Sequence, residues 1–136
     1  MKIGIIGCGV IGSGFATHFS KQHSLLLYDI DKNSSTALAN SLGPKAEVAQ
    51  SLKDLTTGTA VTMLAVKPQC LNDVGEALSS GIHVDHLFIS TLAGVTVERL
   101  KQHFSSVPIL RIMPHIACFH HQGVIALVED AKLSEK

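Results

Sequence analysis

MKIGIIGCGVIG, residues 1–12, is the stretch of sequence that decides how this chain folds. Its apolar run Ile3-Gly4-Ile5-Ile6 predicts a buried strand. Residues 11–19 predict a helix that has small residues on its inner side. A strand that passes through a short glycine-rich turn into a helix is the beginning of a β-α-β unit, so the rest of the chain has to supply the following strands.

Three glycines, Gly7, Gly9 and Gly12, have the spacing G-x-G-x-x-G between the expected strand and helix. In a dinucleotide site the first glycine permits a sharp turn, the second lets the backbone approach a pyrophosphate, and the third lets the helix pack closely on the strand. The N-terminus of the helix then offers unpaired N–H groups and a positive dipole to the phosphates. The pattern predicts a dinucleotide site, and the alternative is a purely structural turn.

Short β-branched runs alternate with longer amphipathic segments along the whole chain. The expected strands are residues 3–6, 24–29, 46–48, 60–66, 86–91, 108–113 and 124–128, and the expected helices are residues 11–19, 34–42, 51–55, 68–80 and 96–103. Asn33 or Ser34 suits the start of the second helix, and Pro68 suits the first turn of the fourth. Strands that are apolar almost throughout and are separated by helices predict a doubly wound α/β fold with a mainly parallel sheet.

Composition narrows the class of protein. The 136 residues suit one domain, and the eleven basic and eleven acidic side chains cancel, so nothing favours binding to nucleic acid or to a membrane surface. The beginning of the chain does not have the pattern of a secretory signal, and no apolar stretch reaches the ~18 residues of a membrane span. Cys8, Cys70 and Cys118 are unpaired in spacing, which favours reduced thiols and a cytoplasmic protein.

Asp29 lies at the end of the second expected strand, seventeen residues after Gly12. An acidic residue at about this distance accepts hydrogen bonds from the ribose hydroxyls of the adenosine, and its charge repels a 2′-phosphate. Lys32 is the nearby cation and the segment has no arginine, so the sequence favours NAD over NADP. The alternative for Asp29 is a solvated strand end or a helix cap.

Three further stretches carry a resemblance to a known family. They are Leu64-Ala65-Val66-Lys67-Pro68-Gln69, then Ser90-Thr91-Leu92-Ala93-Gly94-Val95-Thr96, then Arg111-Ile112-Met113-Pro114. In this order after the glycine turn they resemble the pyrroline-5-carboxylate reductases over nearly all of residues 1–130. The resemblance implies a Rossmann fold and an NAD(P)H-dependent reductase that transfers hydride to the C=N carbon of 1-pyrroline-5-carboxylate, which gives proline.

The resemblance also places residues of this chain around the cofactor. Backbone groups of Val10 and Ile11 would meet the pyrophosphate, and Ala65, Val66 and Lys67 would line the ribose next to the nicotinamide. Ala93 and Gly94, together with Met113 and Pro114, would form walls beside the ring. Lys67 has the alternative of a solvated loop cation, and no side chain is identified as catalytic.

The chain departs from the family at three places. The family has Asn where this chain has Val10, and Asn-Thr-Pro-Ala where it has His115-Ile116-Ala117-Cys118. The family also continues into a helical domain that dimerises and supplies most of the substrate pocket, which we expect to be absent here. Residues 1–136 are therefore expected to be a single cofactor-binding domain, whose alternative function is that of a non-catalytic dinucleotide-binding module. A monomer and a weak homodimer through an exposed edge strand are the expected oligomeric states.

Histidines give a rival hypothesis. His115, Cys118, His120 and His121 lie in an expected loop and are of zinc-ligand type, but their spacing matches no closed zinc site, so we expect no metal centre. The remaining histidines are expected mostly on the surface, at helix ends and connections; they are His18, His23, His83, His86 and His103.

Overall fold

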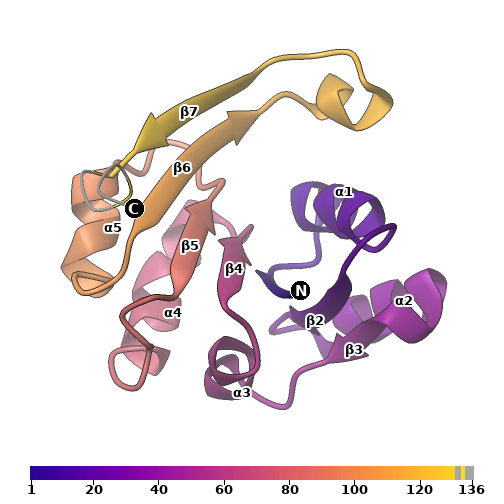
Figure 1. Cartoon of the computed structure of the whole chain (residues 1–136), viewed down its shortest axis with the longest axis horizontal. Coiled ribbons are helices and arrows are strands. Elements are labelled where there is room, and N and C mark those ends of the chain that lie inside the picture. The colour runs from indigo at the N-terminus through magenta and orange to yellow at the C-terminus, as the bar shows by residue number, and fades with distance from the viewer. Residues whose placement is uncertain (131–132, 134–136) are drawn as a thin grey trace.

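The computed structural model describes residues 1–130 and 133, and within them one seven-stranded sheet organises the chain (Figure 1). The strands are β1 (Lys2–Ile6), β2 (Ser24–Tyr28), β3 (Ala46–Val48), β4 (Val61–Leu64), β5 (Leu87–Ser90), β6 (Ile109–Pro114) and β7 (Ile125–Glu129). The α-helices are α1 (Val10–Phe19), α2 (Lys32–Leu42), α3 (Leu52–Thr57), α4 (Leu71–Ala77) and α5 (Val97–His103). Three short 3-10 helices are η1 (Gly43–Lys45), η2 (Pro68–Cys70) and η3 (Ile116–His120).

The strand order is β3-β2-β1-β4-β5-β6-β7, and every neighbouring pair is parallel except β6 with β7. The chain moves outward from β1 to β3 and then returns to β4 on the other side of β1. Strand order therefore reverses between β1 and β4, where doubly wound sheets bind their ligands at the carboxyl ends of the strands. The expected doubly wound, mainly parallel fold is confirmed.

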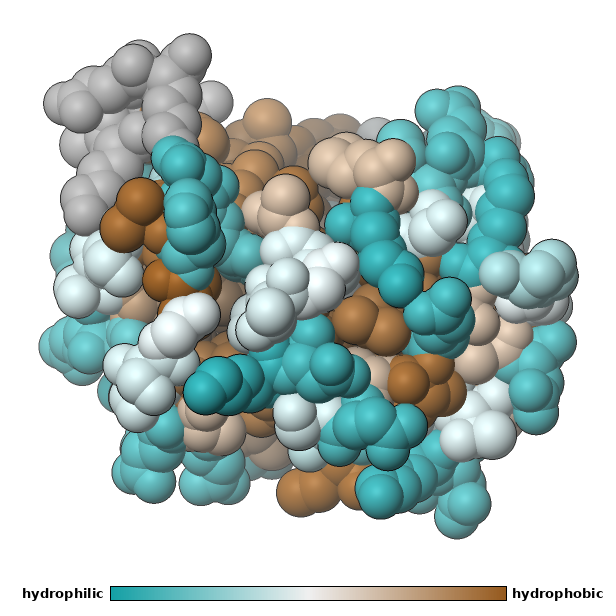
Figure 2. All heavy atoms as spheres, turned by 60° about the horizontal axis from the view of Figure 1, so that its bottom comes forward, coloured by the Kyte–Doolittle hydropathy of each residue, from teal (hydrophilic) through white to brown (hydrophobic). Residues whose placement is uncertain are grey.

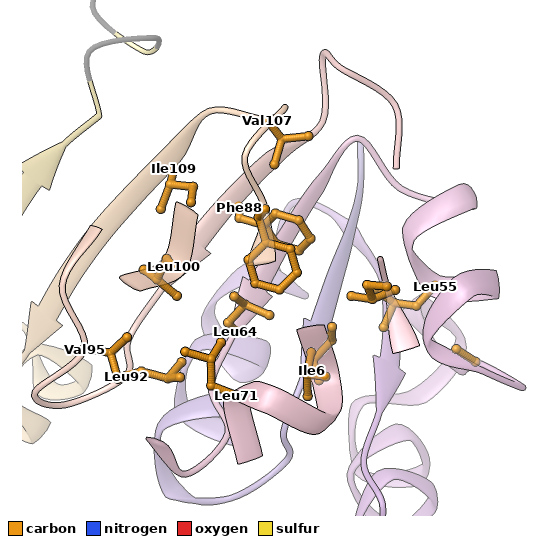
Figure 3. Close-up of a cluster of buried hydrophobic side chains, with 14 of the residues drawn as sticks. Ile6, Leu55, Leu64, Leu71, Phe88, Leu92, Val95, Leu100, Val107 and Ile109 are labelled. Carbon is orange, nitrogen blue, oxygen red and sulfur yellow. The ribbon is translucent and has the colours of Figure 1, made fainter. Parts of the chain in front are cut away.

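One apolar layer lies between the sheet and the helices α3, α4 and α5. Phe88 of β5 is fully buried, and its ring centroid lies 4.6 Å from that of Phe104, just after α5. Figure 3 shows Leu64, Leu71 and Leu100 in the same cluster as Phe88. Because each of these elements contributes aliphatic side chains at helical or strand spacing, the layer closes without a buried charge.

The second apolar layer lies on the opposite face of the sheet, under α1 and α2. Ile5 of β1 and Leu27 of β2 are fully buried there, and Phe15 and Ala16 of α1 pack against them. Both faces of the central strands are thus covered, which explains why these strands are apolar at consecutive positions rather than at every second one. No helix in the part of the chain that the structure describes is long and apolar enough to cross a membrane.

Some local expectations are wrong. The second helix begins two residues earlier than expected, because the carboxylate of Asp31 accepts a hydrogen bond from the Asn33 backbone N–H at 3.0 Å and caps the helix. The expected helix over 68–80 is η2 followed by α4, which ends at Ala77. The expected loop at 115–121 contains the turn η3.

His86 is also an exception. It is buried, although the histidines outside the 115–121 segment are expected mostly on the surface. It is 2% exposed, and its Nε2 lies 2.9 Å from the Thr62 hydroxyl oxygen. Burial lowers the pKa of His86, so the ring stays neutral near pH 7. Thr62 belongs to a neighbouring strand, and its hydroxyl satisfies an imidazole nitrogen that would otherwise be unpaired inside the protein.

Candidate functional site

The glycine turn is built into the sheet by contacts that leave no room for side chains. Gly7 has φ of 97°, and a Cβ atom at Gly7 would lie 2.5 Å from the Ala65 carbonyl oxygen. A Cβ atom at Gly12 would collide with the Gly7 carbonyl oxygen. The Gly7 N–H donates to the Tyr28 carbonyl at 2.8 Å, so the turn is fixed between the ends of β1, β2 and β4.

Gly9 differs from these two glycines because nothing lies within 4 Å of the position its Cβ would occupy. It is the N-cap residue of α1, and no side chain caps the helix there. Val10, the next residue, is 68% exposed. The first turn of α1 therefore presents backbone N–H groups and the positive end of the helix dipole to an open face, which is an arrangement that binds phosphate groups.

Asp29 fastens this turn to the end of β2. Its Oδ2 accepts a hydrogen bond from the Cys8 N–H at 2.7 Å, and its Oδ1 accepts one from the Asp31 N–H at 2.9 Å. A carboxylate has about four lone-pair positions, so each oxygen keeps capacity for one further donor. The structure thus shows Asp29 in a local structural role and leaves it able to accept hydrogen bonds from ribose hydroxyls.

A cavity of about 250 Å³ opens beside Asp29 at the carboxyl ends of β1, β2 and β4. Its lining is Ile6, Gly7, Tyr28, Asp29, Ile30, Leu52, Val66, Cys70, Asp73, Val74 and Ala77. The walls are mostly apolar, and the two carboxylates are those of Asp29 and Asp73. The apolar walls suit a flat heterocycle, and the carboxylates suit a neighbouring group with hydroxyl donors. Their negative charges disfavour a phosphate on that group.

The remaining predicted site residues follow the neighbouring strands. Ala65, Val66 and Lys67 come directly after β4, and the Lys67 side chain is exposed. Ala93 and Gly94 follow β5, where Gly94 has φ of 68°, and they line a second cavity of about 290 Å³ with Pro68, Gln69, Val95 and Arg99. Met113 and Pro114 end β6 and line neither of these two cavities. All the predicted residues thus lie at the same end of the sheet, beyond the carboxyl ends of the parallel strands. They form three groups rather than one pocket.

Sequence reasoning missed residues that reach the first cavity from other elements. Tyr28, Leu52 and Asp73 line it, and no spacing pattern connects them with the glycine turn. The sequence predicts only a reduced thiol at Cys8, whereas the Cys8 backbone N–H also donates a hydrogen bond to Asp29. Burial, followed by the charge of Asp29, raises the pKa of Cys8 to about 12, so its thiol stays protonated and is a poor nucleophile.

The histidines of the 115–121 segment do not converge on one point. His115 Nδ1 accepts a hydrogen bond from the Ala117 N–H at 3.1 Å, which places it as the cap of η3. His121 has φ of 58°, and its ring centroid lies 5.6 Å from that of His18 on α1. Within residues 1–130 and 133, no three histidine, cysteine or acidic side chains are arranged to hold a metal ion.

A larger cleft of about 690 Å³ lies at the opposite end of the strands, near the amino ends of β1 and β4. Thr57, Thr59 and His83 are among its lining residues. Figure 2 shows the molecule from the side that includes this end, and hydrophilic side chains there alternate with smaller hydrophobic areas. The larger volume of this cleft does not make it the ligand site, because parallel sheets bind ligands at the carboxyl ends of their strands, where the glycine turn lies.

Comparison with known proteins agrees with this geometry. Residues 2–94 match the model of a family described as NADP oxidoreductase, coenzyme F420-dependent. The pyrroline-5-carboxylate reductase of Aquifex aeolicus is 29% identical over 140 residues, which cover 100% of this chain and 51% of that protein. The structure of 1-pyrroline-5-carboxylate reductase from Streptococcus pyogenes has a TM-score of 0.78 at 29% identity and covers 96% of this chain and 49% of that one.

A structure of Plasmodium falciparum pyrroline carboxylate reductase with NADP bound has a TM-score of 0.73 at 22% identity, and it covers 96% of this chain and 48% of that one. This chain therefore spans about half the length of the relatives it matches. The resemblance that the three sequence motifs carry is confirmed, and it concerns the N-terminal half of those proteins.

Proposed function

The chain belongs to the family described as NADP oxidoreductase, coenzyme F420-dependent, and from that premise we propose that it is the cofactor-binding part of an NAD(P)H-dependent reductase of the pyrroline-5-carboxylate reductase type. The observation that carries the proposal is the open N-terminus of α1 at Gly9, placed where strand order reverses and next to the Asp29 cavity. A dinucleotide needs a phosphate-binding turn and a neighbouring pocket for its adenosine, and these features supply both.

The residues of this chain have separate tasks in the proposal. Backbone groups of Val10 and Ile11 bind the pyrophosphate, with Gly7, Gly9 and Gly12 giving the turn its shape. Asp29 accepts the ribose hydroxyls of the adenosine. The residues that line the nicotinamide half are Ala65, Val66, Lys67, Ala93, Gly94, Met113 and Pro114. These residues orient the ring and exclude water, which is how a site without an identified catalytic side chain accelerates a transfer between two bound molecules.

When bound, NAD(P)H supplies a hydride for the carbon of a C=N bond, and a proton from solvent completes the amine on the nitrogen. The proposed substrate is a small cyclic imine such as 1-pyrroline-5-carboxylate, by analogy with the relatives. Cys8 takes no part in this transfer, because its raised pKa keeps the thiol neutral. The protein contributes orientation, an apolar wall and a fixed anion-binding turn.

We further propose NAD as the preferred cofactor, because the carboxylates of Asp29 and Asp73 both line the adenosine cavity and oppose a 2′-phosphate. Residues 1–136 act in this proposal as a single cofactor-binding domain in the cytoplasm, as a monomer or a homodimer. Equal numbers of acidic and basic side chains give no reason to add a nucleic-acid or membrane partner.

The test is a titration of the purified chain with NADH and, separately, with NADPH, followed by thermal unfolding. A ligand at a hundred times its Kd stabilises the folded state by about 2.7 kcal/mol, which raises the midpoint by several degrees. The proposed preference for NAD requires a midpoint shift with NADH that is larger than the shift with NADPH at equal concentration. Absence of a shift with either dinucleotide would refute the dinucleotide site itself.

A non-catalytic dinucleotide-binding module is the second candidate function. Val10 and the segment His115-Ile116-Ala117-Cys118 favour it, because the chain departs from the reductase pattern there, at the pyrophosphate and nicotinamide ends of the site. Proline-dependent reduction of NAD⁺ at alkaline pH separates the two functions. Reduction supports the reductase, whereas cofactor binding without reduction supports the module.

A further inference from the structure

Gly14 is a glycine in the interior of α1 that the phosphate-binding pattern does not require. Glycine inside a helix costs about 1 kcal/mol relative to alanine, so its presence needs a physical reason. The structure supplies one, because a Cβ atom at Gly14 would lie 2.5 Å from Cζ and 2.7 Å from Cδ2 of the Phe119 ring. Helix α1 is therefore notched at Gly14, and an aromatic side chain from a distant part of the sequence fills the notch.

Phe119 belongs to η3 and anchors that turn to α1. Its ring meets the Phe15 ring edge to face, with centroids 5.1 Å apart and an interplanar angle of 87°. The His18 ring lies next to it at a centroid distance of 6.0 Å. Phe119 packs against the apolar layer under α1, whereas Ile116, the other large hydrophobic side chain of η3, is 55% exposed. Phe119 therefore makes the apolar contacts of η3 with α1, and His121, directly after η3, adds a ring contact with His18.

The anchored turn begins two residues after the end of β6. Met113 and Pro114, which the proposed function places beside the nicotinamide, lead directly into η3. Helix α1 carries the proposed pyrophosphate site at its first turn, and Figure 1 shows η3 at the far end of the β6–β7 pair, near α1. The contact between Phe119 and Gly14 thus joins the two parts of the chain that border opposite ends of the nicotinamide nucleotide.

We infer that Gly14 and Phe119 form a positioning lock that holds the Met113–Pro114 wall at the correct distance from α1, so that the site accepts the nicotinamide half of the dinucleotide. The inference rests on the proposed function. Met113 and Pro114 are paired with Ala126 and Ile125 of β7 but lie beyond the β5–β6 pairing. Without the lock, this end of the β6–β7 pair therefore occupies a range of positions relative to α1, and only a fraction of molecules is ready to bind the nicotinamide ring. The apparent affinity is the intrinsic affinity multiplied by that fraction, so a competent population of a tenth weakens binding about tenfold.

The lock makes a specific prediction about two ligands. NADH carries the nicotinamide ring that the Met113–Pro114 wall would contact, whereas ADP-ribose has both riboses and the pyrophosphate but no nicotinamide ring. Phe119→Ala and Gly14→Ala should each weaken NADH binding about tenfold and leave ADP-ribose binding within twofold of the wild type. The fluorescence of bound NADH, which reports the surroundings of the nicotinamide, should shift toward that of free NADH in both variants.

Gly14→Ala separates positioning from simple loss of stability, because alanine favours the helix while its methyl group displaces the Phe119 ring. In the Phe119→Ala background the ring is absent, so adding Gly14→Ala should not weaken NADH binding further. Phe119→Leu keeps an apolar group at the position and provides a second variant if Phe119→Ala fails to fold. Thr17→Ala, on the exposed side of α1, is the matched control and should bind both ligands like the wild type.

The outcomes distinguish the lock from the proposed function. If the wild type binds neither NADH nor ADP-ribose, the proposed function fails and the lock fails with it. If the wild type binds both, but Gly14→Ala and Phe119→Ala change neither affinity or weaken both affinities equally, the proposed function stands and the lock is overturned. Selective loss of NADH affinity, together with the non-additive double variant, establishes the lock.

Discussion

Gly9→Ala separates a phosphate-binding turn from a merely structural one. The backbone at Gly9 has φ of −74° and ψ of −161°, which alanine also adopts, and the new methyl group meets no atom within 4 Å. Alanine restricts the unfolded chain, which stabilises the fold by about 0.4–1 kcal/mol, and it is a poorer N-cap than glycine by a similar amount. We expect the free energy of unfolding to change by less than about 0.5 kcal/mol.

The effect on cofactor binding should be much larger, because the methyl group projects into the open space that a pyrophosphate would enter. A phosphate that is pushed away loses a hydrogen bond between a backbone N–H and a charged oxygen, worth about 1.5–3 kcal/mol. This loss corresponds to an affinity about 10- to 150-fold weaker.

Isothermal titration with NADH measures the affinity, and urea unfolding followed by far-UV circular dichroism measures stability, since the chain has no tryptophan. Unchanged affinity in a stable Gly9→Ala protein would show that no ligand approaches this backbone. The glycine spacing would then serve only the turn between β1 and α1.

Three other substitutions test the packing at Gly12, the charge of Asp29 and the burial of His86. Gly12→Ala places a methyl group against the Gly7 carbonyl oxygen, which is backbone and cannot rotate away, so urea unfolding should show a loss of about 1–3 kcal/mol; wild-type stability would contradict the packing role. Asp29→Asn removes a charge that opposes a 2′-phosphate, so the ratio of NADPH to NADH affinity should rise in parallel titrations, and a constant ratio would argue against cofactor selection by Asp29. For His86, burial puts the folded-state pKa below the unfolded value of about 6.5, so the unfolded state binds the proton more readily and stability falls as pH drops through 6.5 toward the folded-state pKa. His86→Gln should flatten this part of the curve of stability against pH, and an unchanged slope would assign the effect to other groups.

The sequence predicts the parallel part of the sheet well because the central strands are apolar at consecutive positions and each connection contains a helix. The length of the connection before β7 also carries information about the direction of that strand. Residues 115–124 connect β6 to β7, and such a short connection does not span a parallel crossover, which needs a dozen or more residues. The antiparallel pairing of Met113 with Ala126 follows from this length.

Features that depend on contacts between distant residues were not predictable in the same way. The burial of His86 depends on Thr62, which lies 24 positions earlier and on another strand. The notch at Gly14 becomes meaningful only when Phe119 is placed beside it. The glycine spacing, by contrast, was readable because its three glycines lie within six residues of one another, although Gly7 and Gly12 also pack against Ala65, which follows β4.

Asp29 shows why a correct residue can still have an incomplete interpretation. The sequence offered two alternatives, a ribose acceptor or a structural strand end, and the carboxylate in fact binds the N–H groups of Cys8 and Asp31. The two roles are compatible, because each carboxylate oxygen keeps a lone pair after these bonds are made and Asp29 also lines the cavity. The shape of the turn therefore depends on Asp29, and under the proposed function the choice of cofactor depends on the same side chain, so a substitution at Asp29 should affect both.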